Sequence, residues 1–296
     1  MLKRWCSWLC VLICGWAGAV AAVTVQDDRQ HPIEIARPPQ RVISLLPSLT
    51  ETVCALGACQ RLVGVDRYSN WPVSVKTLPR MGGGIDPNIE AIVAARPDLV
   101  LLAGSTRGVE RLQSLGLTVL QLEPRTHADA QRVLHTVAVA LGVPRSESER
   151  VWREIDAGVQ AAAQTLSAEG RAQRVYVEVS PVPYGASESS FIGETLQRLG
   201  VGNILPAAMG PFPQVNPELV VRAQPDAILI GDSSRQSMTQ RPGWRQMRAL
   251  RDDRVCAFAP AQADMLVRPG PRLAEAARLM VQCLNRTAAM PQRAQP

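Results

Sequence analysis

"EAIVAARPDLVLL" at residues 90–102 returns in altered form as "ELVVRAQPDAILI" at residues 218–230. The copies begin 128 positions apart, and Glu, Val, Ala, Pro, Asp and Leu occupy the same places in both. Each copy combines a short helical segment, a Pro-Asp turn and an apolar run typical of a buried strand. The repeat therefore predicts two lobes, each built from helices and strands and each containing one copy.

The sequence around the first copy alternates between strand-like and helical patterns. "RVISLLPSLTETVCALGA" predicts a strand at 42–45 and a helix that begins at Ser48, where Glu51 has the spacing of a capping box. Gly57 is expected to end this helix. "RLVGV", "DLVLL" and "TVLQL" add further strands with helical stretches between them. This alternation indicates a largely parallel sheet covered on both faces.

Two long alanine-rich helical segments, 128–141 and 146–166, separate this half from a second α/β region that begins after Gly170. We therefore predict an α/β fold with two Rossmann-like lobes, mostly parallel sheets and one long helix joining them. The expected divisions are a signal peptide at 1–22, an N-terminal lobe at 23–143, a bridging helix at 144–170, a C-terminal lobe at 171–287 and a disordered tail at 288–296.

The N-terminus has the layout of a cleavable secretory signal. Lys3 and Arg4 precede an apolar run at 8–16, and small residues follow at 19–22. The apolar run is shorter than the ~20 residues that a membrane span needs. Ile13 before Cys14 argues against lipid attachment. We expect cleavage near position 21 or 22 and export of the mature chain.

Four cysteines remain after the leader is removed, and four cysteines permit three pairings. In an oxidising compartment we expect Cys54 to pair with Cys59 and Cys256 to pair with Cys283. The alternative is that they are buried thiols, because Cys is also a common small apolar core residue.

Several classes of chemistry lack their usual signatures. The formal net charge of +6 comes without a basic cluster, which favours a mixed solvated surface over a nucleic-acid site. The three histidines form no metal-ligand or nucleophile motif, so we expect no metal site, no cofactor and no catalytic residue. The glycines at 82–84 lack the Lys-Ser/Thr of a phosphate loop. They are either a pliable loop where a ligand approaches the backbone or a simple turn.

Aromatic residues are concentrated in loops near strand ends. "DRYSNWP" contains Tyr68 and Trp71, "SPVPYGASESS" contains Tyr184, and "GPFPQVNPE" contains Phe212. Ligands of open α/β sheets bind at the carboxyl ends of strands, and flat apolar side chains there favour a large, partly apolar ligand. Any one of these residues could instead be an ordinary loop anchor.

Six segments in unbroken order, from "RVISLLPSLTETVCALG" to "RPGPRLAEAARLM", resemble the periplasmic cobalamin- and iron-siderophore-binding family of ABC importers, class III of the solute-binding proteins. The likeness covers residues 41–285 and is greatest to the cobalamin-binding members. It implies a monomeric, non-enzymatic periplasmic receptor that holds a small molecule between its lobes. It also implies delivery to an ABC importer, a membrane permease dimer with a cytoplasmic ATPase.

The resemblance also implies roles for individual residues. Tyr68, Tyr184 and Phe212 match cleft aromatics, although Phe212 stands where the family has Trp. The expected ligand set is completed by Trp71, Gly84, Asp264 and Arg268, the last two in a loop that matches the family's ligand-side loop. The tryptophans that cobalamin receptors carry near Gly84 and Ala103 are absent. Leu199 replaces one cysteine of their disulfide, which leaves Cys283 to pair elsewhere.

Glu90 and Glu218, the first residues of the two repeat copies, match the carboxylates with which the family docks on permease arginines. Either glutamate could instead simply favour the start of a helix through the helix dipole, with no partner.

The function hypotheses are a corrinoid receptor, a receptor for a ferric siderophore or haem, and an exported hydrolase on the same scaffold. A hydrolase needs a nucleophile–base pair, and Ser44, Ser48 and Ser69 have no histidine near them in the sequence.

Overall fold

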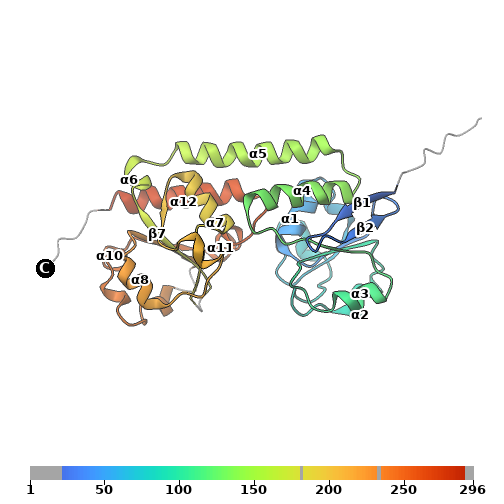
Figure 1. The fold of residues 1–296 in the computed structure, drawn as a ribbon, viewed down its shortest axis with the longest axis horizontal. Helices are drawn as coiled ribbons and strands as arrows, with labels where there is room; N and C mark the ends of the chain where they lie inside the picture. The colour runs from blue at the N-terminus through green and yellow to red at the C-terminus, as the bar shows by residue number, and fades with distance from the viewer. Residues whose placement is uncertain (1–21, 181–182, 232–234, 291–296) are drawn as a thin grey trace, which may run out of the picture.

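A computed structural model of the chain describes residues 22–180, 183–231 and 235–290. Nearly all of the predicted signal peptide and the last six residues of the predicted tail lie outside these ranges. Two α/β lobes lie side by side along the longest axis, and the long helix α5 (Arg145–Gln164) runs over both (Figure 1). Among the described residues, no helix is both long and apolar enough to cross a membrane.

The N-terminal lobe is built on a four-stranded, wholly parallel sheet in the order β4-β3-β5-β6. Its strands are buried on both faces, as their continuous apolar runs predict. A short antiparallel hairpin precedes the sheet. The strands are β1 (Val23–Gln26), β2 (Pro32–Ile35), β3 (Val42–Ser44), β4 (Leu62–Val65), β5 (Leu99–Leu102) and β6 (Val119–Gln121).

The helices of this lobe are α1 (Pro47–Ala55), α2 (Ile89–Ala94), α3 (Val109–Ser114) and α4 (His127–Ala140). The predicted capping box of α1 is wrong. The helix begins at Pro47, whose fixed φ suits a first helical position, and its N-cap is Leu46. Ser48 therefore lies inside the helix, and the Glu51 side chain extends into the other lobe. Gly57 follows the helix with φ +74°, as expected for a residue that ends it.

The C-terminal lobe has a sheet in the order β11-β10-β7-β8, with β9 also paired to β7, and only β8 is antiparallel. The predicted α/β fold with mostly parallel sheets is thus confirmed. The strands are β7 (Arg174–Ser180), β8 (Tyr184–Gly185), β9 (Gly202–Asn203), β10 (Ala227–Gly231) and β11 (Val255–Phe258). The main helices are α7 (Phe191–Leu199), α8 (Pro217–Ala223), α11 (Pro260–Leu266) and α12 (Leu273–Ala288).

The Pro-Asp turn of the repeat makes the same contact in both lobes. Asp98 Oδ2 accepts the Arg41 backbone N–H at 3.0 Å, and Asp226 Oδ2 accepts the Arg174 backbone N–H at 2.9 Å. The aspartate backbone N–H donates back to the same residue at 2.7 Å in each case. The turn therefore ties the repeat strand, β5 or β10, to the start of its neighbour, β3 or β7. This part of the repeat is architectural.

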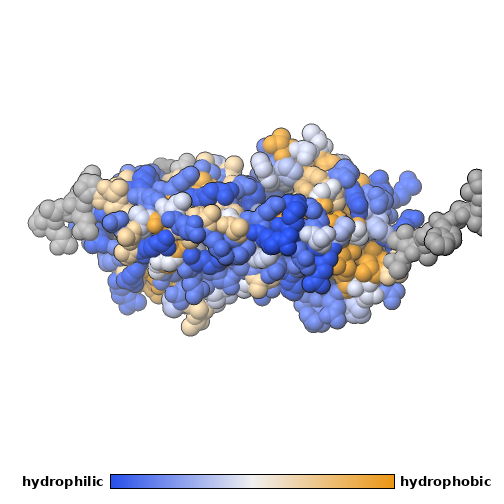
Figure 2. Space-filling view, turned by 90° about the horizontal axis from the view of Figure 1, so that it is seen from above, coloured by the Kyte–Doolittle hydropathy of each residue, from blue (hydrophilic) through white to orange (hydrophobic). Residues whose placement is uncertain are grey.

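Helix α5 is amphipathic and packs closely on α12. A Cβ at Gly158 would lie 2.6 Å from the Ala274 Cβ, so the close approach of the two helices requires glycine there. The outer face of α5 carries ion pairs at helical spacing, such as Arg145 with Glu149. Figure 2 views the molecule from this side, and hydrophilic residues dominate its middle. The short α6 (Ala168–Arg171) follows α5 and leads into the C-terminal lobe.

Both predicted disulfides are present. Cys54 and Cys59 pair at the end of α1, with their Cα atoms 4.1 Å apart. Cys256 of β11 pairs with Cys283 of α12, with a Cα separation of 5.9 Å. The second disulfide links the sheet of the C-terminal lobe to the helix that packs beneath α5.

Candidate functional site: a cleft between the lobes

A cleft of about 730 Å³ lies between the two lobes, with a wall that is mostly apolar. The start of α1 and the loops after β4, β5 and β6 supply the N-terminal wall, at the carboxyl edge of the parallel sheet where ligands of such sheets bind. The C-terminal wall comes from the start of α7, the loop before α8 and the segment after α11. The large apolar residues of the whole cleft wall are Leu46, Tyr68, Phe191, Met209, Phe212 and Val267.

Four of the seven predicted ligand residues line this cleft, namely Tyr68, Phe212, Asp264 and Arg268. The other three lie outside its wall, so their contact with ligand remains a prediction that their position does not support. Trp71 lies against Arg272, whose guanidinium is 5.1 Å from the ring centroid.

The other two residues outside the cleft wall take part in local backbone structure. Tyr184 begins β8, which pairs with β7, and it forms a β-bridge with Gln214. Gly84 follows Gly82, which bridges to Pro87 within a closed turn. This geometry matches the simple-turn interpretation of the three glycines.

Tyr68 presents a largely free ring on a fixed backbone. Its backbone N–H donates to Asp66 Oδ2 at 2.8 Å, while its side chain is 61% exposed. Burial raises the pKa of Asp66, and hydrogen bonds from Ser69 and Tyr68 counteract that rise. Arg80 donates to the carbonyls of Asp66 and Ser69 and so fixes the same loop. The backbone of this loop is therefore fixed, while the Tyr68 ring is not buried in the core and is available to contact a ligand in the cleft.

Phe212 supplies the matching aromatic surface on the C-terminal lobe. Its side chain is 36% exposed, and its ring packs 5.9 Å from the buried Phe191 ring in a tilted arrangement. The loop backbone around it is held by β8, because the Gly185 N–H donates to the Pro213 carbonyl at 3.0 Å. Both lobes thus offer an anchored aromatic side chain to the same cleft.

Arg268 lies at the base of the cleft and is 6% exposed. Its guanidinium contacts Glu51 Oε1 at 2.9 Å, Asn70 Oδ1 at 2.8 Å, the Tyr68 carbonyl at 3.0 Å and Asp264 Oδ2 at 3.0 Å. Glu51, Asn70 and Tyr68 belong to the N-terminal lobe, so Arg268 links the two lobes directly. Most of its donors are used in this link and not presented to the cleft.

Glu51 is the centre of this interlobe bridge. Its Oε2 accepts Arg272 Nε at 2.9 Å and its Oε1 accepts Arg272 Nη2 at 2.6 Å, in addition to the bond from Arg268. The Glu51 side chain is 2% exposed. Asn70 Nδ2 donates to Asp264 Oδ2 at 2.7 Å, which fixes the more exposed carboxylate at the cleft surface.

A second bridge joins α4 to α7 across the lobes. The Phe191 backbone N–H donates to the Arg125 carbonyl at 2.9 Å, and the His127 N–H donates to Glu194 Oε2 at 2.5 Å. The His127 ring is buried, with Nε2 2.8 Å from Thr195 Oγ1. Burial, assisted by the positive charge of Arg198, lowers the pKa of His127 to about 4. His127 is therefore neutral at pH 7 and acts as a structural contact.

Sequence reasoning missed Glu51 and Asn70 as site residues. Glu51 had a local explanation as a helix-cap partner, and its actual partners are more than 200 positions away. Two arginines four positions apart, Arg268 and Arg272, were the available signal for a shared acidic partner. Among the described residues, no group of three or more His, Cys, Asp or Glu side chains could hold a metal ion.

The arrangement suits the binding of a large, partly apolar solute by contact area, with polar groups at one end of the cleft. The two bridges connect the lobes on either side of the cleft through direct hydrogen bonds and ion pairs.

Comparisons with known proteins agree with this geometry. A family model described as periplasmic binding protein matches residues 42–261. The chain is 28% identical over 267 residues to the uncharacterized ABC transporter substrate-binding lipoprotein YvrC of Bacillus subtilis. This match covers 86% of the chain and 83% of the relative. The chain is 29% identical over 258 residues to the vitamin B12-binding protein of Pectobacterium carotovorum, covering 86% and 90% respectively.

Among solved structures, a periplasmic heme binding protein from Pseudomonas aeruginosa superposes with a TM-score of 0.74 at 25% identity. The match covers 87% of this chain and 96% of that one. The family model spans well over half of the sequence and includes strands of both lobes. The resemblance noted from the sequence motifs is thereby confirmed: the chain belongs to the periplasmic binding protein family.

Proposed function

We propose that this protein is the solute-binding component of an ABC importer and that it captures a corrinoid between its lobes. The observation that carries the proposal is the cleft between the lobes, whose wall contains one anchored aromatic side chain from each lobe together with the polar side chains of Asp264 and Arg268. A corrinoid has a broad macrocycle with apolar faces and a rim of amides, which suits such a wall. A relative named as a vitamin B12-binding protein supports the same ligand class.

A ferric siderophore or haem is the second candidate. The exposed Tyr68 favours it, because a tyrosine oxygen can ligate haem iron and this side chain enters the cleft. The likeness to a heme binding protein supports it as well. The corrinoid is preferred because the chain is 29% identical to the relative named for vitamin B12 and 25% identical to the heme binding protein.

The proposed site of delivery is the edge of the molecule opposite α5. Glu90 and Glu218 are exposed in the first turns of α2 and α8, and Figure 1 shows these helices at that edge, one in each lobe. Asparagine caps both helices, since Asn88 Oδ1 accepts the Ala91 N–H and Asn216 Oδ1 accepts the Glu218 N–H.

These caps weaken the alternative interpretation, in which the two glutamates only favour the starts of their helices. The helix starts already have side-chain acceptors, and neither carboxylate forms an ion pair with any of the described residues. Paired exposed carboxylates on two lobes fit two arginine sites on a two-fold permease. The predicted leader would place such a receptor in the periplasm, where we expect it to act as a monomer.

A hydrolytic function finds little support in the geometry. Ser44 and Ser69 both bond to Thr50, and the Ser48 hydroxyl is buried without a partner. One serine does contact a histidine, since Ser148 Oγ lies 2.7 Å from His135 Nδ1. Ser148 is 1% exposed, however, and its hydroxyl donates to the Arg145 carbonyl, so no substrate could reach it.

Competition calorimetry tests the proposal. The mature protein is titrated with cyanocobalamin alone, and then after saturation with haemin or with a ferric siderophore. The proposal expects cyanocobalamin to bind and to be unaffected by the other two compounds. Tight binding of haemin or the siderophore together with no heat from cyanocobalamin would transfer the function to the second candidate.

A further inference from the structure

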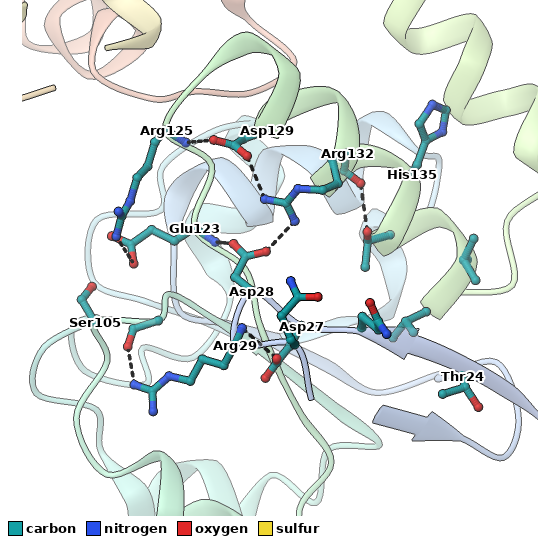
Figure 3. A pocket seen from close by; sticks show the side chains of 16 residues that line it. Thr24, Asp27, Asp28, Arg29, Ser105, Glu123, Arg125, Asp129, Arg132 and His135 are labelled. Atoms are coloured by element: carbon teal, nitrogen blue, oxygen red, sulfur yellow. Dashed lines mark hydrogen bonds and ion pairs between the residues drawn. The ribbon is translucent and has the colours of Figure 1, made fainter. Parts of the chain in front are cut away.

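A second hollow of about 990 Å³ opens in the N-terminal lobe beside the cleft (Figure 3). We call it the side cavity. It lies between the turn of the β1–β2 hairpin, the loops after β5 and β6, and the face of α4. Ser105, Glu123 and Arg125 line both the side cavity and the cleft. These three residues therefore form a wall that the two spaces share.

The side cavity differs from the cleft in its chemistry. The cleft wall is mostly apolar, whereas the side cavity is lined largely by charged and amide side chains. A ligand with one apolar body and one polar arm would match the chemistry of both spaces at once.

The carboxylates of the side cavity are turned towards the backbone. Asp27 Oδ1 accepts the N–H groups of Arg29 and His31 at 2.9 and 2.8 Å. Asp28 Oδ2 accepts the Glu123 N–H at 2.6 Å, and Asp129 Oδ2 accepts the Arg125 N–H at 3.2 Å. Their acceptor capacity is thus spent largely on holding the surrounding loops.

The three arginines that line the side cavity differ in how many of their side-chain donors have partners. Arg132 is paired with Asp28 and Asp129. By contrast, Arg29 donates one side-chain bond, to the Gly104 carbonyl at 3.0 Å, and the side-chain ion pair of Arg125 is a 3.9 Å contact with Glu123. The Arg125 side chain is 65% exposed.

Figure 3 shows the ends of Arg29 and Arg125 on the same side of the hollow, with Ser105 and Glu123 between them. Each guanidinium has five N–H donors, so Arg29 and Arg125 both have donors that their contacts with Gly104 and Glu123 do not use.

We infer that the side cavity is a second subsite for the receptor's ligand and that Arg29 and Arg125 bind an anionic arm, the phosphodiester of a corrinoid nucleotide loop. The inference rests on the proposed function and adds where the nucleotide arm lies. Arginine binds phosphate oxygens with paired, charge-assisted hydrogen bonds, and both arginines have donors to spare. In the complex, the phosphodiester replaces Glu123 as the main partner of Arg125.

The test compares two corrinoids that differ in this arm. Cyanocobalamin has the phosphodiester and its base, and dicyanocobinamide lacks both. Each is titrated into the wild-type mature protein, Arg29→Ala, Arg125→Ala and the control Arg145→Ala, whose side chain is 83% exposed on α5. Arg29→Ala and Arg125→Ala should each weaken cyanocobalamin binding roughly tenfold relative to dicyanocobinamide binding. Arg29→Ala should leave dicyanocobinamide binding unchanged, because Arg29 lies outside the cleft wall. Arg145→Ala should change neither.

Glu123→Gln provides an opposite test, because it removes the negative charge that competes for Arg125. It should strengthen cyanocobalamin binding relative to dicyanocobinamide. Thermal unfolding of each variant checks that it folds. Because Arg29 lines the side cavity but not the cleft, its variant remains informative if Arg125→Ala is unstable.

Failure of the subsite and failure of the proposed function would give different results. If the arginine variants weaken both corrinoids equally, or neither, the subsite is overturned while the proposed function stands. If the wild-type protein binds neither corrinoid, the proposed function is overturned and the subsite with it.

Discussion

Glu51 Oε1 in the N-terminal lobe lies 2.9 Å from Arg268 Nη1 in the C-terminal lobe, although 217 residues separate them in the chain. Both side chains are almost fully buried. A buried charge is tolerated only when its partners are complete, so each residue depends on the other. Since Arg268 also binds the Tyr68 carbonyl, this pair connects the stability of the fold to the position of a cleft aromatic.

Removing the carboxylate should therefore destabilise the whole protein. Glu51→Ala leaves Arg268 and Arg272 buried without their shared partner, and we expect the free energy of unfolding to fall by about 3–5 kcal/mol. Urea denaturation measures the change, with Glu169→Ala as the control for an exposed acid. A loss below about 1 kcal/mol, comparable to a surface ion pair, would show that the bridge does not hold the lobes together.

His127 should make stability depend on pH. Its folded-state pKa is about 4, below the ordinary 6.5, so between these values the unfolded chain binds a proton that the folded chain does not. The contribution of the neutral ring is fully present above pH 6.5 and is lost as the pH falls towards 4, by about 3 kcal/mol in all.

Unfolding free energies at pH 7 and pH 4.5 test this contribution. We expect wild-type protein to lose more stability between the two values than His127→Gln, which cannot be protonated. Equal losses in both proteins would show that His127 is not the group responsible.

Tyr68, Phe212 and Tyr184 were equivalent candidates in the sequence, but only the first two line the cleft. Tyr68→Ala and Phe212→Ala should each weaken cyanocobalamin binding by roughly tenfold or more, because each removes a large contact surface from the cleft wall. Tyr184→Ala is the matched control, since Tyr184 is similarly exposed but lies outside that wall. Calorimetry that finds Tyr184→Ala as damaging as Tyr68→Ala would contradict the placement of the ligand.

Local patterns in the sequence were enough to predict the elements and the parallel sheets. Apolar runs such as 99–102 are buried strands, and Gly57 and Gly200 follow helices with positive φ. The aromatic-rich loops indicated Tyr68 and Phe212, and the structure places both in the cleft wall. The start of α1 was mispredicted because Ser48 fits a capping box by spacing, while Pro47 begins the helix one position earlier.

Features that depend on long-range contacts could not be predicted in the same way. The Glu51 bridge and the side cavity join residues from segments distant in the chain, and nothing in the local sequence of Glu51 or Arg29 indicates those neighbours. Tyr184 is the reverse case, because its loop composition favoured a place in the cleft while the structure places it in a strand pair outside the cleft wall. Composition identifies residues that suit a ligand, whereas tertiary packing decides which of them reach it.

Docking can be separated from ligand binding by charge reversal. Glu90→Arg combined with Glu218→Arg should abolish corrinoid uptake in cells that carry the cognate importer, because two attractive contacts with permease arginines become repulsive. Cyanocobalamin affinity should stay the same, since neither residue lines the cleft. The helix-dipole cost of each change is about 0.3–1 kcal/mol, too little to unfold the protein.

The matched control for docking is Glu169→Arg. This exposed acid also lies in the first turn of a helix, α6, which Figure 1 shows near α5 and away from the proposed docking edge, so it shares the dipole effect without the proposed contact. Normal uptake by the Glu90 and Glu218 double variant would refute docking through these carboxylates.

The most direct measurement of the central claim is an equilibrium titration of the mature protein with cyanocobalamin, followed by the visible absorbance of the corrinoid retained after removal of free ligand. Our account predicts saturable binding of one corrinoid per chain, which is lost in the Tyr68→Ala, Phe212→Ala double variant. A flat titration up to tens of micromolar, with properly folded wild-type protein, would contradict it.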